Sequence, residues 1–147
     1  MKWEFRVDPT LVKRLSEGAM LSIEEAAQEM AEYQIANVQL RAASGIGSDD
    51  RPMKPYSRGY AKKRTDSGRD ASKRTLNWSG RMLRSVSLLS LSYVGQQIVA
   101  RLGLSGFEAQ KAEWNEAISP WFQLSPGDRT ILLRVLERRL RQRKDLS

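Results

Sequence analysis

The chain has 147 residues, of which 40% are hydrophobic, and a formal net charge of +8 at pH 7. It contains no cysteine and no histidine, which excludes disulfides, thiolate chemistry, a Ser-His-Asp triad and a histidine-based zinc site within the chain. The length predicts one domain with a single core. The sequence lacks an apolar signal segment and a membrane-length apolar run, so we expect a soluble protein made and used in a cytoplasm.

The first residues predict a short strand and then a brief helix. Apolar and charged side chains alternate over residues 2–8, which is the period of a half-buried strand. Asp8 and Pro9 suit the N-cap and the first position of a helix that ends near Gly18.

A long helix is predicted next, from a capping box of Ser22 and Glu25 to about Ala43, with Gly45 just past its end. Its apolar stripe drifts around the helix, and we expect this helix to pack on the sheet. Small residues on it would let another element approach closely: Ala26, Ala27, Ala31 and Ala36.

The positive charge is concentrated in residues 51–84, which we call the basic stretch. Eleven Lys and Arg residues stand there against Asp66 and Asp70, a net charge of +9, so the rest of the chain sums to −1. Such a segment has few large apolar residues to offset the entropy of ordering, so it must be a solvated arm or bind an acidic partner. Its cations are Arg51, Lys54, Arg58, Lys62, Lys63, Arg64, Arg69, Lys73, Arg74, Arg81 and Arg84.

Within the basic stretch only short helices are predicted. Two prolines in residues 52–55 argue against regular structure there. Residues 56–64 fit a short helix with Ser57 at its start, and residues 65–73 form a polar loop. Ser79 then suits the N-cap of a helix of one or two turns.

From residue 85 the pattern becomes that of a β-hairpin. Apolar residues on either side of Gly95 predict two strands over residues 86–102. The alternation shifts phase at Leu88–Leu89, which indicates a bulge or a strand covered on both faces. Ser105 and Glu108 form a second capping box, which starts another helix.

That helix stops at Pro120, and a last helix follows, with Ser125 as N-cap, Pro126 at the first position and an acidic Asp128. Its predicted buried face consists of Leu132, Leu133, Val135, Leu136 and Leu140. The sum is an α+β fold, in which a small antiparallel β-sheet packs against a long helix and a C-terminal helix follows. We expect a single domain over the whole chain, with residues 45–78 as an extended basic loop or arm.

Three segments, in this order and at this spacing, resemble one known family. They read P-M-K-P-Y-S-R-G-Y-A-K-K (52–63), L-N-W-S-G-R-M-L-R-S (76–85) and P-W-F-Q-L-S-P-G-D (120–128). Over residues 20–140 the chain resembles the virion morphogenesis or tail completion proteins of long-tailed bacteriophages such as phage Mu. It departs from them in residues 107–118, which lack the histidine and glycine that members often carry there, so the subfamily stays open.

The resemblance implies a structural protein of the phage neck and no catalysis. Such a protein completes or attaches the tail from a ring between the head connector and the tail tube. The partners implied are copies of the chain in a ring, a hexamer or a dodecamer, and the adjacent connector or head-closure and tail-terminator or tail-tube proteins. Contact with genomic DNA in the channel is left open, and no membrane is involved. The location implied is the virion neck, after assembly in the bacterial cytoplasm.

The basic stretch is a solvated loop, a docking element for an acidic face of a neighbouring subunit, or a DNA-binding arm. Binding to DNA would give a log–log salt slope of roughly −5 if about half of its cations met phosphates. Three aromatic residues among so many cations are weak support for base stacking, so we favour protein docking. The aromatic pair next to Pro120 is either a second, exposed contact or ordinary packing. The candidate docking residues are Tyr56, Arg58, Tyr60, Lys62, Lys63, Arg64, Arg81, Arg84, Trp121 and Phe122.

Other interpretations have less support. Glu25, Glu29 and Glu32 share a helical face, but no second carboxylate helix or histidine completes a metal site, so we interpret them as a solvated acidic stripe. Residues 45–50 predict a turn and lack the Lys-Ser/Thr of a phosphate loop. The alternative function is a small basic DNA-binding protein that uses residues 51–84 as its arm. An enzyme is the weakest hypothesis, and we expect no catalytic residue, no metal and no cofactor.

Overall fold

The structure is a computed structural model that describes residues 2–7, 23–77, 79–94 and 97–146. Predictions for Pro9 and the Ser22 capping box lie outside these residues. The described elements are β1 (Lys2–Val7), α2 (Ile23–Ala43), α3 (Arg58–Asp66), α4 (Arg81–Arg84), β2 (Ser87–Val94), β3 (Gln97–Gly103), α5 (Gly106–Ile118) and α6 (Pro126–Leu146). The predicted α+β class is therefore confirmed.

The strands form one antiparallel sheet in the order β1-β3-β2. The predicted hairpin is confirmed as β2 and β3, and the N-terminal strand pairs with the other edge of β3, where Phe5 stands opposite Ala100. The register between β2 and β3 shifts between Leu88 and Ser90, so the bulge occurs where the change of phase predicted it.

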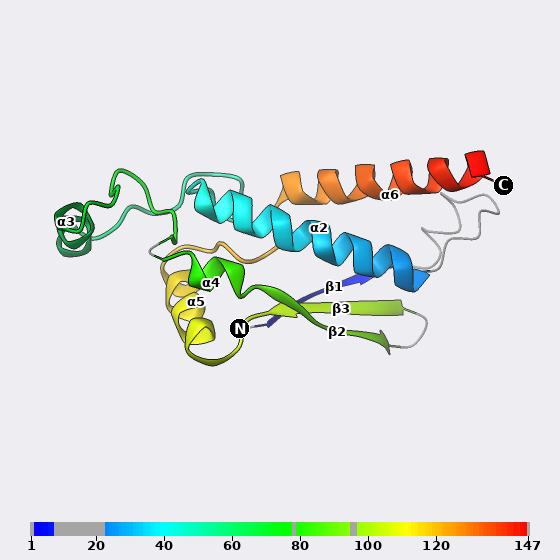
Figure 1. Ribbon diagram of the computed structural model, residues 1–147, viewed down its shortest axis with the longest axis horizontal. Helices are drawn as coiled ribbons and strands as arrows, with labels where there is room; N and C mark the ends of the chain where they lie inside the picture. The colour runs from blue at the N-terminus through cyan, green and yellow to red at the C-terminus, as the bar shows by residue number, and fades with distance from the viewer. Residues whose placement is uncertain (1, 8–22, 78, 95–96, 147) are drawn as a thin grey trace.

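The long helix α2 lies across the sheet, and α6 lies alongside α2 (Figure 1). Ala26, Ala27 and Ala31 are buried, because their small side chains let the backbone of α2 approach the strands closely. Ala36, which the sequence analysis grouped with them, is exposed on the outer side of the helix. The prediction of close approach therefore holds for the first half of α2.

The C-terminal end of α2 has the geometry that Gly45 predicted. Gly45 has a left-handed φ of 80°, and its N–H donates to the carbonyl of Ala42 at 3.0 Å. The N–H of Ile46 donates to the carbonyl of Arg41 at 2.9 Å. Together these bonds form a Schellman motif, which satisfies the last carbonyls of the helix and turns the chain sharply toward residues 46–53.

The start of α6 is also confirmed. The N–H of Asp128 donates to Oγ of Ser125 at 2.9 Å, and the N–H of Ser125 donates back to Oδ2 of Asp128 at 3.1 Å. This reciprocal cap satisfies N–H groups that a helix start leaves unpaired. Leu133 was predicted wrongly, because it lies on the exposed side of α6. Leu132, Val135 and Leu136 are buried as predicted, and the Leu140 side chain lies outside what the structure describes.

The helix α5 begins where Ser105 predicted, but without the predicted capping box. Within the described part of the chain, the Ser105 side chain makes no capping hydrogen bond. The Glu108 carboxylate instead accepts from Nζ of Lys111 at 3.5 Å, one turn along the helix. The helix ends at Ile118, just before Pro120, as expected.

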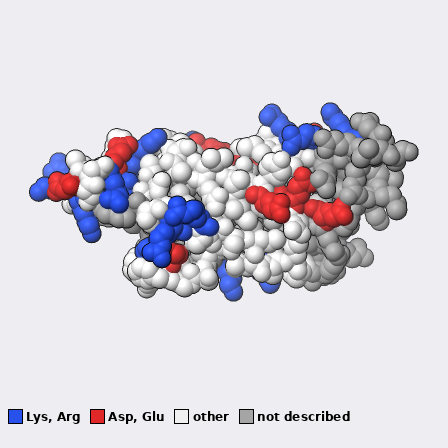
Figure 2. Space-filling model, in the orientation of Figure 1, with Lys and Arg blue, Asp and Glu red and all other residues white. Residues whose placement is uncertain are grey.

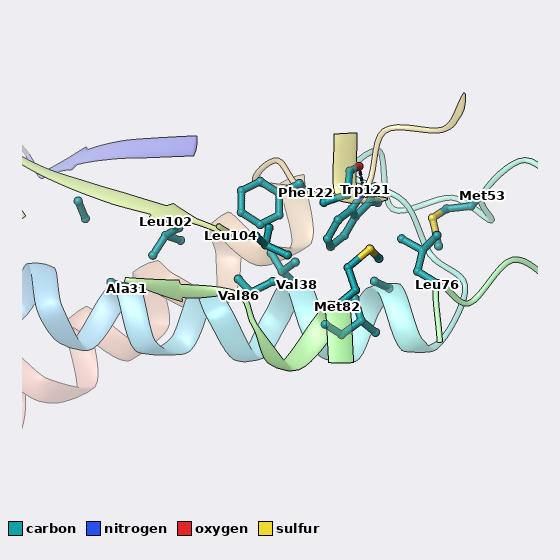
Figure 3. Close-up of a cluster of buried hydrophobic side chains, with 14 residues drawn as sticks. Ala31, Val38, Met53, Leu76, Met82, Val86, Leu102, Leu104, Trp121 and Phe122 are labelled. Carbon is teal, nitrogen blue, oxygen red and sulfur yellow. Dashed lines mark hydrogen bonds between the residues drawn. The ribbon is translucent and has the colours of Figure 1, made fainter. Parts of the chain in front are cut away.

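The three segments that carry the family resemblance meet in one part of the hydrophobic core (Figure 3). Met53 comes from the first segment, Leu76 and Met82 from the second, and Trp121 and Phe122 from the third. Residues far apart in the chain thus build one packed junction beside the C-terminal half of α2.

Candidate functional site

Residues 54–77 form a folded projection, which we call the basic lobe. In Figure 1 the lobe extends beyond the end of α2, with α3 at its tip. Ser57 begins α3 as predicted, because its Oγ accepts the N–H of Tyr60 at 3.4 Å. The segment predicted as an arm therefore contains a capped helix, and its own side chains hold it together.

Tyr56 lies at the centre of the basic lobe. The guanidinium carbons of Arg64 and Arg74 lie 4.9 Å and 4.7 Å from its ring centroid, and the ring of Tyr60 lies 5.0 Å away, tilted. Each cation–π contact stabilises by about 0.5–1 kcal/mol when exposed and about 2 kcal/mol when desolvated. The hydroxyl of Tyr56 also accepts the N–H of Thr75 at 3.3 Å. Tyr56, a candidate docking residue, thus holds the lobe together.

Arg64 was predicted to dock on a partner, and this prediction is wrong. Only 3% of Arg64 is exposed. Its guanidinium donates to the carbonyls of Asp70 at 2.8 Å and Asn77 at 3.3 Å. These carbonyls lie in irregular segments without a backbone ladder, so a buried arginine supplies the donors that they need. Arg64 therefore stabilises the inside of the lobe.

Arg74 fixes the base of the lobe to the body of the protein. It is 6% exposed and donates to the carbonyl of Lys54 at 2.7 Å and to that of Pro55 at 3.3 Å. Its Nη1 also donates to Oδ1 of Asn115 in α5 at 3.2 Å. One side chain thus links both ends of the lobe to a body helix, which holds the projection in a defined direction.

The outer surface of the lobe carries candidate docking residues that are exposed to solvent. Arg58, Lys62 and Lys63 are exposed on α3, together with part of Tyr60, and Figure 2 shows cations at this end of the molecule. The N–H and hydroxyl of Ser72 donate to Asp70 and hold the pKa of its carboxyl below the ordinary value. The Asp70 carboxylate thus stabilises the local backbone at Ser72.

Arg81 and Arg84 lie on α4 and are exposed, as a docking role requires. The prediction of Ser79 as N-cap was wrong by one residue, because Gly80, with a φ of 77°, occupies that position and no side chain caps the helix. The Ser79 hydroxyl still accepts the N–H of Arg81 at 3.4 Å. Figure 2 shows a second group of Lys and Arg side chains over the α4–α5 end of the body. The exposed cations among the docking candidates therefore lie on two surfaces, one on α3 and one on α4.

A groove of about 970 Å³ separates the basic lobe from α5. Its lining includes large apolar side chains from both sides, Tyr60 on the lobe and Trp114 and Ile118 on α5. It also includes cationic side chains, Lys54, Lys63, Arg74 and Lys111, and one carboxylate, Glu108. Sequence analysis missed this groove because its two walls lie about fifty residues apart in the chain.

Trp121 and Phe122 were offered as an exposed contact or as packing, and the packing interpretation is confirmed. Trp121 is 0% and Phe122 2% exposed, and their rings meet edge to face at 5.3 Å. Nε1 of Trp121 donates to the carbonyl of Ala112 at 3.2 Å. The Glu116 carboxylate accepts both backbone N–H groups at 2.8 Å and 3.1 Å, which holds this segment against the core. These rings are therefore unavailable to a partner.

A buried polar cluster around Arg41 holds the same segment from the other side. Arg41 donates from Nη1 to the carbonyl of Trp121 at 3.0 Å and from Nη2 to that of Gln123 at 2.8 Å. Nε2 of Gln34 donates to the Asp128 carboxylate at 3.1 Å. The sequence analysis did not identify this cluster, because nothing local in α2 indicates which of its polar residues face inward.

The acidic stripe of α2 forms a separate surface. Figure 2 shows acidic side chains gathered on the half of the molecule away from the lobe, and Glu25, Glu29 and Glu32 belong to that half of α2. Among the described residues, no cluster of three potential acidic, histidine or cysteine ligands is arranged to hold a metal ion. No described helix has the length and apolar character needed to cross a membrane.

No protein-family model, curated protein sequence or solved structure matches this chain.

Proposed function

We propose that this chain is a structural subunit of a long-tailed phage neck, which joins tail to head as part of a ring. The basic lobe is the observation that carries the proposal, because it is a folded projection with exposed cations at its tip. A contact that is already ordered before binding loses less conformational entropy on association. The order and spacing of the three family-like segments support the same role.

The mechanism in this proposal is geometric. The lobe of each subunit contacts an acidic face of a neighbouring protein, and the body packs against its own copies. A closed ring requires heterologous, head-to-tail contacts, in which different surfaces of two copies meet. The basic lobe lies beyond the C-terminal end of α2 (Figure 1), whereas the acidic stripe of Glu25, Glu29 and Glu32 belongs to the N-terminal half of that helix. Head-to-tail copies would therefore bring opposite charges together.

The test is electron microscopy of particles from a phage in which this gene is disrupted. We expect DNA-filled heads beside complete but unattached tails, and joined virions after purified protein is added. Normal joined virions without the gene product would refute the neck assignment.

DNA binding is the second candidate, because Arg58, Lys62 and Lys63 are exposed together on α3. If these three cations meet phosphates, the log–log salt slope of binding should include about −3 from them. Changing all three to glutamine should then weaken binding to bare duplex DNA and flatten the slope. Unchanged DNA affinity in this variant would eliminate the DNA-binding interpretation.

A further inference from the structure

The groove beside the lobe exposes an unusual amount of apolar surface. Trp114 is 58% exposed, and Ile118 and Tyr60 are exposed as well. All three line the same groove, between α5 and the lobe. Soluble proteins rarely leave large apolar side chains together at one concave site unless something binds there. The groove is therefore a candidate binding site for an apolar side chain.

The charges around this apolar surface indicate the chemistry of the rest of the ligand. Lys54, Lys63 and Lys111 contribute three amines to the lining, and Glu108 is the single carboxylate in it. Nζ of Lys111 lies 3.5 Å from Glu108 and 4.8 Å from the ring centroid of Phe107, so one amine is partly compensated within α5. The lining still has an excess of positive charge, and this excess favours an acidic ligand.

The walls of the groove favour a polypeptide over a single-stranded nucleic acid. A nucleic-acid groove needs open aromatic faces on which bases stack. Among the described lining residues, the Tyr56 ring is already in contact with Tyr60, Arg64 and Arg74. Trp114 remains as one exposed ring, which does not by itself make a platform for successive bases. The lining also includes the nearly buried Leu76 and Met82 and the exposed Ile118, and these apolar side chains suit leucine-like or aromatic side chains of a peptide.

We propose that this groove binds a segment of a partner protein in which acidic residues flank a large apolar side chain. The apolar side chain packs against Trp114 and Ile118, and the flanking carboxylates pair with Lys54, Lys63 and Lys111. The inference rests on the proposed function only for the source of the segment, a neighbouring neck protein. The binding itself is measured without any phage.

The test uses the full chain and a fluorescein-labelled peptide in which aspartates flank a Leu-Trp pair, with binding followed by anisotropy. One control peptide has lysine for each aspartate, and another has serine for Leu and Trp. We expect the acidic-apolar peptide to bind about tenfold or more tightly than either control. Equal affinity for all three peptides, or displacement of the acidic peptide by single-stranded oligo-dT, would overturn the proposal.

Variants then locate the binding site. Trp114→Ser and Lys111→Glu should each weaken the acidic-apolar peptide about tenfold. The matched controls are Leu40→Ser, which replaces a 70% exposed residue outside the groove, and Arg134→Glu on the exposed side of α6. Equal losses in the controls would place the peptide elsewhere and refute the groove. Peptide binding in the groove, combined with normal virions from the disrupted phage, would keep this inference and remove the neck role.

Discussion

Nη2 of Arg41 lies 2.9 Å from Oδ2 of Asp128, and both side chains are almost fully buried. Arg41 is in the last turn of α2 and Asp128 in the first turn of α6, so the ion pair joins the two long helices. Because Arg41 also donates to the carbonyls of Trp121 and Gln123, the pair positions the segment that leads into α6. It thereby holds part of the junction on which the base of the lobe is built.

Removal of one partner from this buried pair should be costly. Arg41→Met keeps much of the side-chain volume but leaves Asp128 buried without its cation, and we expect the free energy of unfolding to fall by about 3–5 kcal/mol. Arg101→Met is the matched control, because the Arg101–Glu4 pair is exposed and screened by solvent, so its loss should change the stability far less. Urea denaturation measures both. Similar losses in the two variants would contradict the structural role given to Arg41.

The cation–π cluster of the lobe predicts a local effect. Tyr56→Ala removes the ring against which Arg64 and Arg74 pack, so the lobe should open more often while the core of the body stays folded. Trypsin cleavage within residues 58–69 should become about thirtyfold faster, since the lobe loses two contacts of about 1 kcal/mol each. Tyr56→Phe keeps the ring but loses the hydrogen bond from the Thr75 N–H, so its cleavage rate should lie between those of the wild type and Tyr56→Ala. Unchanged cleavage in Tyr56→Ala would show that the ring does not hold the lobe.

Replacement of Trp121, in the third segment, and of Trp114, in α5, should affect stability very differently. Trp121→Ala empties a fully buried site and should lower the free energy of unfolding by about 3–5 kcal/mol. Trp114→Ala changes a mostly exposed side chain and should alter the free energy of unfolding by no more than about 0.5 kcal/mol. Chemical denaturation followed by far-UV circular dichroism compares them. A larger loss of stability for Trp114→Ala than for Trp121→Ala would contradict the placement of Trp121 in the core and Trp114 in the groove.

Asp50 should make stability depend on pH. Its Oδ2 accepts the N–H of Gly127, near the start of α6, at 2.7 Å. Hydrogen bonds from the Ser125 hydroxyl and then from this N–H hold the pKa of the Asp50 carboxyl below its ordinary value. Because the folded-state pKa is below the unfolded one, the stabilisation is present above the unfolded pKa of about 3.9 and is lost as pH falls through the folded pKa.

Asp50→Asn removes that charge and tests this dependence. Asparagine tolerates the positive φ of 61° at this position, so the backbone should remain unstrained. We expect a loss of about 0.5 kcal/mol at neutral pH, at the lower end for a helix cap because the site is exposed. Thermal unfolding at a series of pH values should show the difference shrinking toward strongly acidic pH. A difference that is constant across the series would exclude the carboxylate as its cause.

Local patterns predicted the elements that local physics determines. The change of phase at Leu88–Leu89 located the bulge, Gly45 located the end of α2, and Ser125 with Asp128 located the start of α6. In each case the residues that decide the geometry are neighbours in the chain. Backbone hydrogen bonding and steric limits on φ are therefore sufficient to predict these features from the local sequence.

The side-chain roles within the site depend on contacts that no local pattern contains. A run of cations predicts a solvated surface, and nothing in it distinguishes Arg64 from Lys63. The distinction arises because Tyr56 and the carbonyls of Asp70 and Asn77 converge on the Arg64 guanidinium. Similarly, an aromatic pair after a proline does not reveal that the Glu116 carboxylate holds its backbone in the core.

The most direct test of the proposed joining role uses a phage in which this gene is disrupted. Purified protein that combines Arg58→Glu, Lys62→Glu and Lys63→Glu is added to its particles, and the test is whether this variant rescues joining. These side chains are exposed on the lobe, so the fold should be unaffected. The control reverses three cations on α6, Arg129, Arg134 and Arg138, which are also exposed. Electron microscopy should show separate filled heads and complete tails with the lobe variant, and joined virions with the control. Joined virions with the lobe variant would contradict the account.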